Sequence, residues 1–336
     1  PEILEVGADK LNGFLAELAA LEPYKHGIQD TLRQSKHVLD ADAEAMMAAT
    51  SMMRTTPSNT YGTLANADMP WPTITLSDGE EVRLDQAAYS KYRSVDIRSD
   101  RKIVFDAFWG KWKEYERSIG TMLAGQVNVD VFNHRQRGYP TSLAASLGNN
   151  NVPETVYHTL IAETNNNLST LHRYLELRGR MLGVDDLGYH DGYPSLVKSG
   201  LKFPISAGKQ LTLEAVAPLG NAYTEVMSSG FDNRWMDVYP RPGKRSGAYM
   251  NDGAYDVHPY VLMNYNDDYN SVSTLAHEWG HAMHSYLSIK NQPYPTADYS
   301  IFVAEVASTF NEALLLDHML KTAASDDERL FYLGSG

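Results

Sequence analysis

The sequence of 336 residues contains no cysteine. This absence excludes disulfides, thiolate zinc fingers, iron–sulfur clusters and cysteine nucleophiles, so histidine and carboxylate side chains are left to hold any metal ion. Basic residues are also few, because 29 Lys and Arg stand against 42 Asp and Glu and give a formal net charge of −13. This balance argues against nucleic acid as a partner, because phosphate backbones are bound by basic surfaces.

Long apolar runs are missing as well. No stretch approaches the roughly 18 consecutive apolar residues of a transmembrane helix. The first thirty residues also lack the basic-then-apolar pattern of a signal peptide. We therefore expect no membrane partner and a cytoplasmic location. With 43% hydrophobic and 21% charged residues, the composition is that of a folded protein rather than a disordered one.

The spacing of apolar residues predicts a mainly α fold. Helical spacing extends over residues 2–20, 27–53, 85–95, 99–130, 154–183, 213–228, 271–289 and 299–321. Alternating segments on either side of Ser77-Asp78-Gly79 predict a β-hairpin over residues 73–84. Residues 260–265 and 246–249 are the other candidate strands. Residues 54–70, rich in Thr, Asn, Pro and Gly, are typical of a linker.

Changes in composition divide the chain into three predicted segments. Residues 1–70 form a helical N-terminal lobe, and residues 71–230 form a helical body that contains the hairpin. From residue 231 onward, Gly, Pro, Asn and Tyr alternate irregularly before two further helices. Residues 231–336 are therefore predicted as a separate C-terminal region with a small β-sheet.

The motif that carries chemistry is H-E-x-x-H, formed by His277, Glu278 and His281. On a helix, two histidines four residues apart lie about 40° apart, so both can reach one ion from the same face. The glutamate is offset by about a further 100°, which places it beside the ion as a candidate general base. The alternative is a purely structural role, in which two buried histidines form hydrogen bonds with backbone carbonyls.

A third ligand is expected from the next predicted helix. A catalytic zinc takes three protein ligands and leaves one position open. Glu305 and Glu312 lie seven residues apart on an apolar helix, with Ser308 between them, so the three side chains share one face. Glu305 is the predicted third ligand. Ser308 and Glu312 are candidates to orient the histidines, although an ordinary ion pair explains Glu312 equally well.

These residues resemble the M3 family of zinc oligopeptidases, and within it the oligoendopeptidase F branch. The resemblance rests on the segment 277–281, on Glu305 with Ser308 and Glu312 behind it, and on the segments 244–249 and 258–265. It implies one Zn²⁺ per chain, bound by His277, His281 and Glu305, with Glu278 activating water. It also implies a zincin-type catalytic region with a small β-sheet inside a large helical, clam-like body that hydrolyses short peptides.

The resemblance further implies where a peptide binds. The segment Gly247-Ala248-Tyr249 is expected to pair with the substrate backbone as an added strand. His258 is a weaker candidate for substrate binding. His284 is expected to be a packed histidine or one that contacts the ligands, rather than a ligand itself.

One departure from the family is large. Members carry a further C-terminal helical region whose His and Tyr stabilise the oxyanion, and this sequence stops soon after Glu312. It also begins at Pro1 and ends in Gly-Ser-Gly, so it resembles a piece of a longer enzyme. Three alternatives stay open: a peptide-binding fragment without activity, a related zinc carboxypeptidase, and a metal-free helical interaction protein. The sequence indicates neither the cleavage preference nor the oligomeric state.

Overall fold

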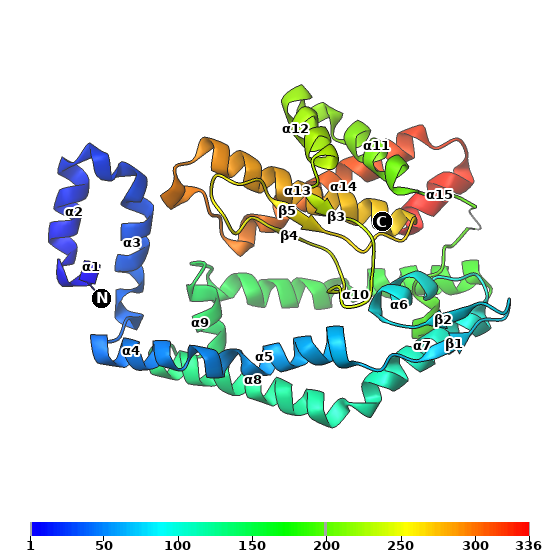
Figure 1. Cartoon of the computed structure of the whole chain (residues 1–336), viewed down its shortest axis with the longest axis horizontal. Helices are drawn as coiled ribbons and strands as arrows, with labels where there is room; N and C mark the ends of the chain where they lie inside the picture. Colours follow the sequence, from blue (N-terminus) through cyan, green and yellow to red (C-terminus); the bar gives the residue numbers. More distant parts are fainter. Residues whose placement is uncertain (1, 198–199, 336) are drawn as a thin grey trace. The chain divides into compact units, whose positions relative to one another are not determined.

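The structure is a computed structural model that describes residues 2–197 and 200–335. Most of the described chain is helical, and the strands form one sheet of two strands and one of three (Figure 1). The mainly α fold predicted from apolar spacing is thus confirmed. Among the described helices, none is long and apolar enough to cross a membrane.

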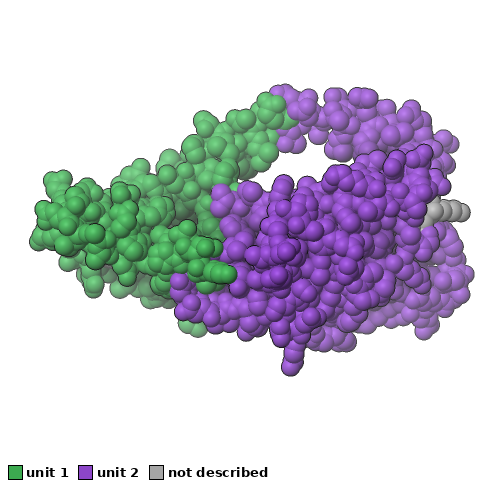
Figure 2. Space-filling model, turned by 90° about the horizontal axis from the view of Figure 1, so that it is seen from above, with its two compact units in different colours: residues 1–68, 116–163, 288–302 green, residues 69–115, 164–287, 303–336 purple. Residues whose placement is uncertain are grey.

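The chain divides into two compact units, each made of separate stretches of sequence (Figure 2). Unit 1 comprises residues 1–68, 116–163 and 288–302, and unit 2 comprises residues 69–115, 164–287 and 303–336. All residues of the predicted site belong to unit 2. The division into three contiguous segments stays a prediction.

Unit 1 corrects one expectation, because the linker predicted over residues 54–70 is wrong. The segment is helical: α5 spans Ser51–Thr63 and continues into a π-helical turn over Leu64–Asp68. It packs against α8, where a side-chain carbon at Gly125 would lie 3.1 Å from Pro57 Cγ. Packing therefore overrides the weak helix propensity of the segment. The helices of this unit are α1 (Glu2–Glu5), α2 (Ala8–Glu17), α3 (Lys25–Gln34), α4 (Ala41–Ala49), α5, α8 (Glu116–Gln136), α9 (Ser142–Gly148) and the start of α10 (Glu154–Leu182).

Four of the predicted helices are interrupted. Residues 2–20 contain both α1 and α2, and residues 27–53 run from α3 through α4 into α5. The other two are each split in two. The segment 99–130 contains α7 and α8, which are separated at Tyr115, and the segment 213–228 spans the end of α11 and most of α12. The second break falls at Pro218 and at Gly220, whose φ of +96° is open to glycine at no steric cost. The helices of unit 2 are α6 (Gln86–Tyr92), α7 (Arg98–Glu114), the rest of α10, α11 (Ile205–Ala215), α12 (Asn221–Asp232), α13 (Tyr269–Asn291), α14 (Ile301–Thr322) and α15 (Asp326–Ser335).

The predicted hairpin is confirmed, and β1 (Thr73–Thr75) pairs antiparallel with β2 (Glu81–Arg83). The second sheet has the order β3-β5-β4. Its central strand β5 (Tyr260–Leu262) runs parallel to β3 (Met236–Asp237) and antiparallel to β4 (Tyr249–Asn251). A strand was predicted over residues 246–249, but the observed strand β4 begins only at Tyr249, the last residue of that segment. Within the described part of the chain, strand β4 is paired with another strand on one side only.

The core of unit 2 joins this sheet to the helices around it. Val261 and Met263 pack in one apolar cluster with Leu275, Trp279 and Met283 of α13. The buried amide of Asn311 on α14 donates to the carbonyl of Ala276 and accepts a hydrogen bond from Tyr223 on α12. These contacts fix α13 between the sheet and the neighbouring helices.

Candidate metal centre

Helices α13 and α14 approach each other closely at Gly280. A side-chain carbon at this position would lie 2.6 Å from Ser308 Cα and 2.7 Å from the Ala307 carbonyl oxygen. Only a glycine allows two backbones to come this near. Because Glu305 precedes Ser308 by about one helical turn, the close approach brings its carboxylate to the two histidines of α13.

Three potential ligand atoms converge between the two helices. The Nε2 atoms of His277 and His281 are 3.2 Å apart, and Glu305 Oε2 lies 3.2 Å from the first and 3.4 Å from the second. In a tetrahedral zinc site with bonds of about 2.0–2.1 Å, ligand atoms lie about 3.3–3.4 Å apart. The triangle formed by these three atoms therefore has the size of one face of such a tetrahedron. The fourth corner of the tetrahedron is left for another ligand.

A hydrogen bond with Glu312 favours the tautomer of His277 that suits metal binding. His277 Nδ1 lies 3.2 Å from Glu312 Oε2, and Ser273 Oγ donates to the same carboxylate at 3.1 Å. A proton on Nδ1 leaves the Nε2 lone pair directed into the triangle. The hydrogen bond with Glu312 raises the pKa of His277, while the same bond lowers the pKa of Glu312.

The other two members of the triangle differ in their surroundings. Burial lowers the pKa of His281, the neighbouring His277 lowers it further, and the backbone of Ala304 forms a hydrogen bond with the ring. Ser308 contacts Glu305 rather than a histidine, because Ser308 Oγ donates to Glu305 Oε2 at 2.8 Å within the same helix. Ser308 thus positions the carboxylate, and Glu312 positions His277.

Glu278 is buried next to the triangle without belonging to it. Burial raises the pKa of Glu278 to about 7, and the carboxylates of Glu305 and Glu312 act in the same direction. The charge of His277 and a hydrogen bond from the backbone N–H of Met250 oppose this rise. The glutamate of the motif therefore faces strand β4, while the histidines face α14.

The register of the sheet shows which groups of β4 point outward. The N–H groups of Val261 and Met263 donate toward β3, to the carbonyls of Trp235 just before it and of Asp237 within it. Met250 lies opposite Val261. The backbone groups of Met250 therefore point away from β5, because outward and inward residues alternate in antiparallel pairs. By the same alternation, the backbone groups of Ala248, two residues before Met250, point to this outer edge, where the N–H of Met250 donates to Glu278.

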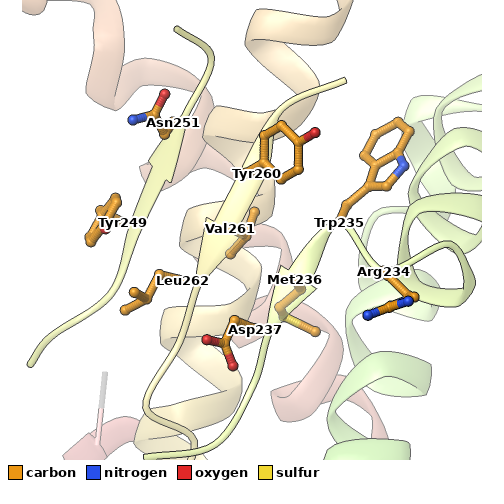
Figure 3. Close-up of a pocket in the computed structure, with 9 residues that line it drawn as sticks. All are labelled: Arg234, Trp235, Met236, Asp237, Tyr249, Asn251, Tyr260, Val261 and Leu262. Carbon is orange, nitrogen blue, oxygen red and sulfur yellow. The ribbon is translucent and has the colours of Figure 1, made fainter. Parts of the chain in front are cut away.

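The predicted substrate-binding residues lie around this strand. Gly247 and Ala248 line a pocket at its start, and Tyr249 lines a second pocket of about 630 Å³ over the open face of the sheet. Figure 3 shows this face, with Tyr249 and Tyr260 on neighbouring strands. His258 stacks on Trp235 at 4.6 Å between ring centroids, so it lies at the far strand rather than at the outer edge of β4.

His284 lies one turn beyond His281 on α13, outside the group of three potential ligands. Burial lowers its pKa, and the charge of Asp252 acts in the opposite direction. The next residue, Ser285, is buried and donates to Asp252 Oδ2 at 2.6 Å. This bond and the one from Met250 to Glu278 fasten β4 and the loop after it to one face of α13.

Sequence patterns did not indicate several of these contacts. Asp252 and the N–H of Met250 belong to a loop and to a three-residue strand, which have no period of their own, and nothing in the sequence pairs them with Ser285 or Glu278 on α13. The close approach of α13 and α14 does have a sequence signal. Gly280 lies inside a helical pattern, where a glycine usually allows close packing.

Comparison with known proteins identifies the family. Residues 92–333 match the sequence profile of Peptidase family M3, which is more than half of the chain. The chain belongs to this family. Residues 2–70 of the M3 chain match a second profile, described as Oligopeptidase F. The resemblance indicated by the H-E-x-x-H segment is thus confirmed.

Two curated relatives of the M3 chain carry related names. Oligopeptidase PepF of Bacillus subtilis is 41% identical over 99% of this chain and 50% of its own length. Group B oligopeptidase PepB of Streptococcus agalactiae is 34% identical over 99% of this chain and 55% of its own length. The M3 chain therefore spans about half the length of the curated relatives it matches.

Solved structures agree with this assignment. A chain from Chlamydophila abortus with 33% identity superposes with a TM-score of 0.76, over 99% of the M3 chain and 56% of that chain. Oligoendopeptidase-F from Enterococcus faecium has 29% identity and a TM-score of 0.68, over 99% of the M3 chain and 53% of its own. The helical fold with small sheets is therefore that of M3 peptidases.

Proposed function

We propose that this chain carries the zinc site and the general base of an oligoendopeptidase, an enzyme that hydrolyses internal bonds of short peptides. The observation that supports this most is the triangle of ligand atoms of His277, His281 and Glu305, with Glu278 buried beside it. Its separations of 3.2–3.4 Å suit zinc, and its two imidazoles and one carboxylate form a common set for a catalytic zinc. One ion per chain is expected.

A zinc ion in such a site acts as a Lewis acid that polarises a carbonyl group and makes water more acidic. Glu278 takes a proton from the attacking water as the water oxygen bonds to the carbonyl carbon. It then passes the proton to the amine nitrogen as the carbon–nitrogen bond breaks. Glu312 keeps the Nδ1 proton on His277, and Ser308 holds the carboxylate of Glu305 in place.

The outer edge of β4 is the proposed binding site for the substrate backbone. The backbone groups of Ala248 point outward at a position where a peptide can add as a further strand. Tyr249 and Gly247 flank this position, whereas His258 stacks on the far side of the sheet. An extended peptide bound there lies next to Glu278, because Met250 of the same strand donates to its carboxylate.

The proposal is tested by metal analysis together with cleavage of a quenched-fluorescent peptide blocked at both ends. We expect one zinc per chain and internal cleavage. Glu278→Gln should retain zinc while kcat falls by about 10²–10⁴-fold, the usual contribution of a general base. Glu305→Ala should lose both zinc and activity. The exposed Glu225→Gln on α12 is the matched control and should change neither.

The outcomes separate the alternatives. Cleavage that needs a free C-terminus would identify a carboxypeptidase. Zinc binding without cleavage would leave a peptide-binding chain and overturn the activity proposed for it. A chain that binds no zinc at micromolar concentration would overturn the metal centre itself.

A further inference from the structure

One side chain connects the segment that follows β5 with the segment that leads into β4. The Nδ2 of Asn264, two residues after the end of β5, donates to the carbonyl of Gly247 at 2.7 Å and to the carbonyl of Arg245 at 3.0 Å. The NH₂ group of an amide carries two N–H donors. Both donors of Asn264 therefore hold the backbone just before β4.

These two hydrogen bonds lie where the regular pairing of the sheet ends. The last paired residues are Tyr249 and Leu262, so Gly247 would lie opposite Asn264 if the register continued. Gly247 has a φ of +79°, a left-handed value that regular strands do not adopt. The amide of Asn264 therefore takes the place of a backbone donor for the Gly247 carbonyl.

The orientation of Ala248, between Gly247 and Tyr249, follows from these contacts. The C=O and N–H of one trans peptide unit point in opposite directions. Because the Gly247 carbonyl points to Asn264, the N–H of Ala248 points to the outer edge of β4. Because Tyr249 is paired with β5, the carbonyl of Ala248 points to the same outer edge. Asn264 therefore determines the direction of a backbone group at the proposed substrate edge, from the other side of the strand.

Other contacts hold the rest of the loop before β4. The side chain of Lys244 is 2% exposed, and its Nζ donates to the carbonyl of Asp237 and forms an ion pair with its carboxylate, both at 3.2 Å. Ser246 Oγ donates to Gln86 Oε1 on α6 at 2.5 Å. We therefore expect loss of the Asn264 amide to release the peptide unit before Ala248 without unfolding the loop.

We propose that Asn264 is a positioning residue for peptide hydrolysis, because its amide turns the N–H of Ala248 toward the substrate backbone. This inference rests on the proposed function. A peptide strand at the outer edge of β4 can accept a hydrogen bond from the Ala248 N–H and donate one to the Ala248 carbonyl. Such bonds are the same in the bound substrate and in the transition state. They therefore contribute to KM more than to kcat.

The isosteric substitution Asn264→Asp tests this role, because it replaces both donors with a carboxylate that repels the two carbonyls. The substrate is a quenched-fluorescent peptide blocked at both ends. We expect KM to rise about 3- to 10-fold, the effect of a lost hydrogen bond, while kcat changes less than about twofold. Asn264→Ala removes the donors without adding charge and should raise KM as well. Urea denaturation identifies the variants that are folded.

Substrates with an ester in place of one amide connect the effect to the strand edge. The ester is moved through the bonds that flank the cleaved bond, and at each position it removes one substrate N–H. In the unaltered chain, one position should lower kcat/KM about 3- to 10-fold. In Asn264→Asp, the same ester should have a smaller effect, because its partner on Ala248 is already displaced. The double-mutant cycle measures this coupling.

Asn233→Asp, directly after α12, is the matched control. The Nδ2 of Asn233 also donates twice, to the carbonyl and to the hydroxyl of Ser229, so the substitution removes the same two donors. This variant should keep the KM and the ester profile of the unaltered chain. An unchanged KM in folded Asn264→Asp would overturn the proposal, and so would an ester effect that is equal in Asn264→Asp and the unaltered chain.

Failure of the proposed function gives a different result. If the unaltered chain cleaves no peptide, binding of the same amide and ester peptides is measured by calorimetry. A Kd that the ester raises about 3- to 10-fold in the unaltered chain, and not in Asn264→Asp, would support the role of Asn264 in peptide binding while the peptidase is rejected. Absent binding, or an equal ester effect in both chains, would overturn the positioning role as well.

Discussion

Substitution of Gly280 by alanine tests how the metal centre is assembled. The new side-chain carbon would lie 2.6 Å from Ser308 Cα, whereas ordinary contact begins at 3.4 Å, so α14 must retreat by 3.4 − 2.6 = 0.8 Å. The three nearest atoms all belong to the backbone of α14, so no side-chain rotation relieves the clash. The 3.2 and 3.4 Å separations between Glu305 and the histidines should widen by a similar amount.

The two consequences of this change differ in size. Overpacking lowers the free energy of unfolding by about 1–3 kcal/mol. Replacement of a helical glycine by alanine raises it by about 1 kcal/mol. The free energy of unfolding of the metal-free protein should therefore fall by about 0–2 kcal/mol. Zinc sites tolerate only about ±0.2 Å in ligand distance. We therefore expect zinc affinity to fall by at least about 10- to 100-fold, as when the contacts that orient a ligand are lost.

Chelator competition measures the affinity, and urea denaturation of the metal-free protein measures the stability. Gly110→Ala on α7, where nothing lies within 4 Å, should leave zinc affinity unchanged. Gly230→Ala places its new carbon 2.5 Å from Trp279 Cη2, on another side of α13, and should lower stability more than zinc affinity. Unaltered zinc binding by a folded Gly280→Ala variant would refute the reasoning that this crossing positions Glu305.

Three further predictions concern single contacts. Glu312→Ala removes the acceptor for His277 Nδ1, and chelator competition should show zinc affinity reduced about 10- to 100-fold. Asn311→Leu removes buried hydrogen bonds of α14 and should lower the free energy of unfolding in urea by about 1–3 kcal/mol. Burial alone would raise the pKa of Asp191, but hydrogen bonds from two arginines and the backbone hold it well below its usual range. This carboxylate stabilises the fold above pH ~4, and the stabilisation is lost as pH falls toward its folded pKa. Asp191→Asn should therefore cost about 3 kcal/mol at pH 7 and flatten the acid limb of the stability profile.

Each of these has a contrary outcome. Wild-type zinc affinity in Glu312→Ala would mean that another group keeps the proton on His277. Unchanged urea midpoints for Asn311→Leu would show that the amide contributes no net stability. An acid limb that is identical in Asp191→Asn and the unaltered chain would assign acid sensitivity to other carboxylates.

The convergence of the candidate metal ligands was largely predictable because its pattern is local. His277, Glu278 and His281 lie on one helix, and helical geometry alone brings them together. The position of Glu305 on the next helix was predictable from its place on an apolar segment. The contact of Ser308 with this carboxylate was not, since it depends on how side chains turn within one helix face.

The parts that sequence reasoning missed depend on tertiary contacts. Residues 54–70 have poor helix formers, yet the segment is helical as far as Asp68, and its α5 part contacts α8. Strand β3 has two residues and therefore no readable alternation. The bond from Met250 to Glu278 needs the register of the sheet, which no spacing within the chain encodes.

The helical hairpin formed by α13 and α14 also determines how the metal centre closes in an unfolded chain. Glu305 follows His281 by only 24 positions in the sequence. Joining the ends of such a loop costs about 3 kcal/mol of chain entropy, and doubling its length would add only about 0.6 kcal/mol. Apparent free energies of binding at structural zinc sites are about 10–16 kcal/mol, several times that cost. We therefore expect that zinc, bound as proposed by His277, His281 and Glu305, is captured by this one hairpin during folding, before the distant segments of unit 2 have joined it.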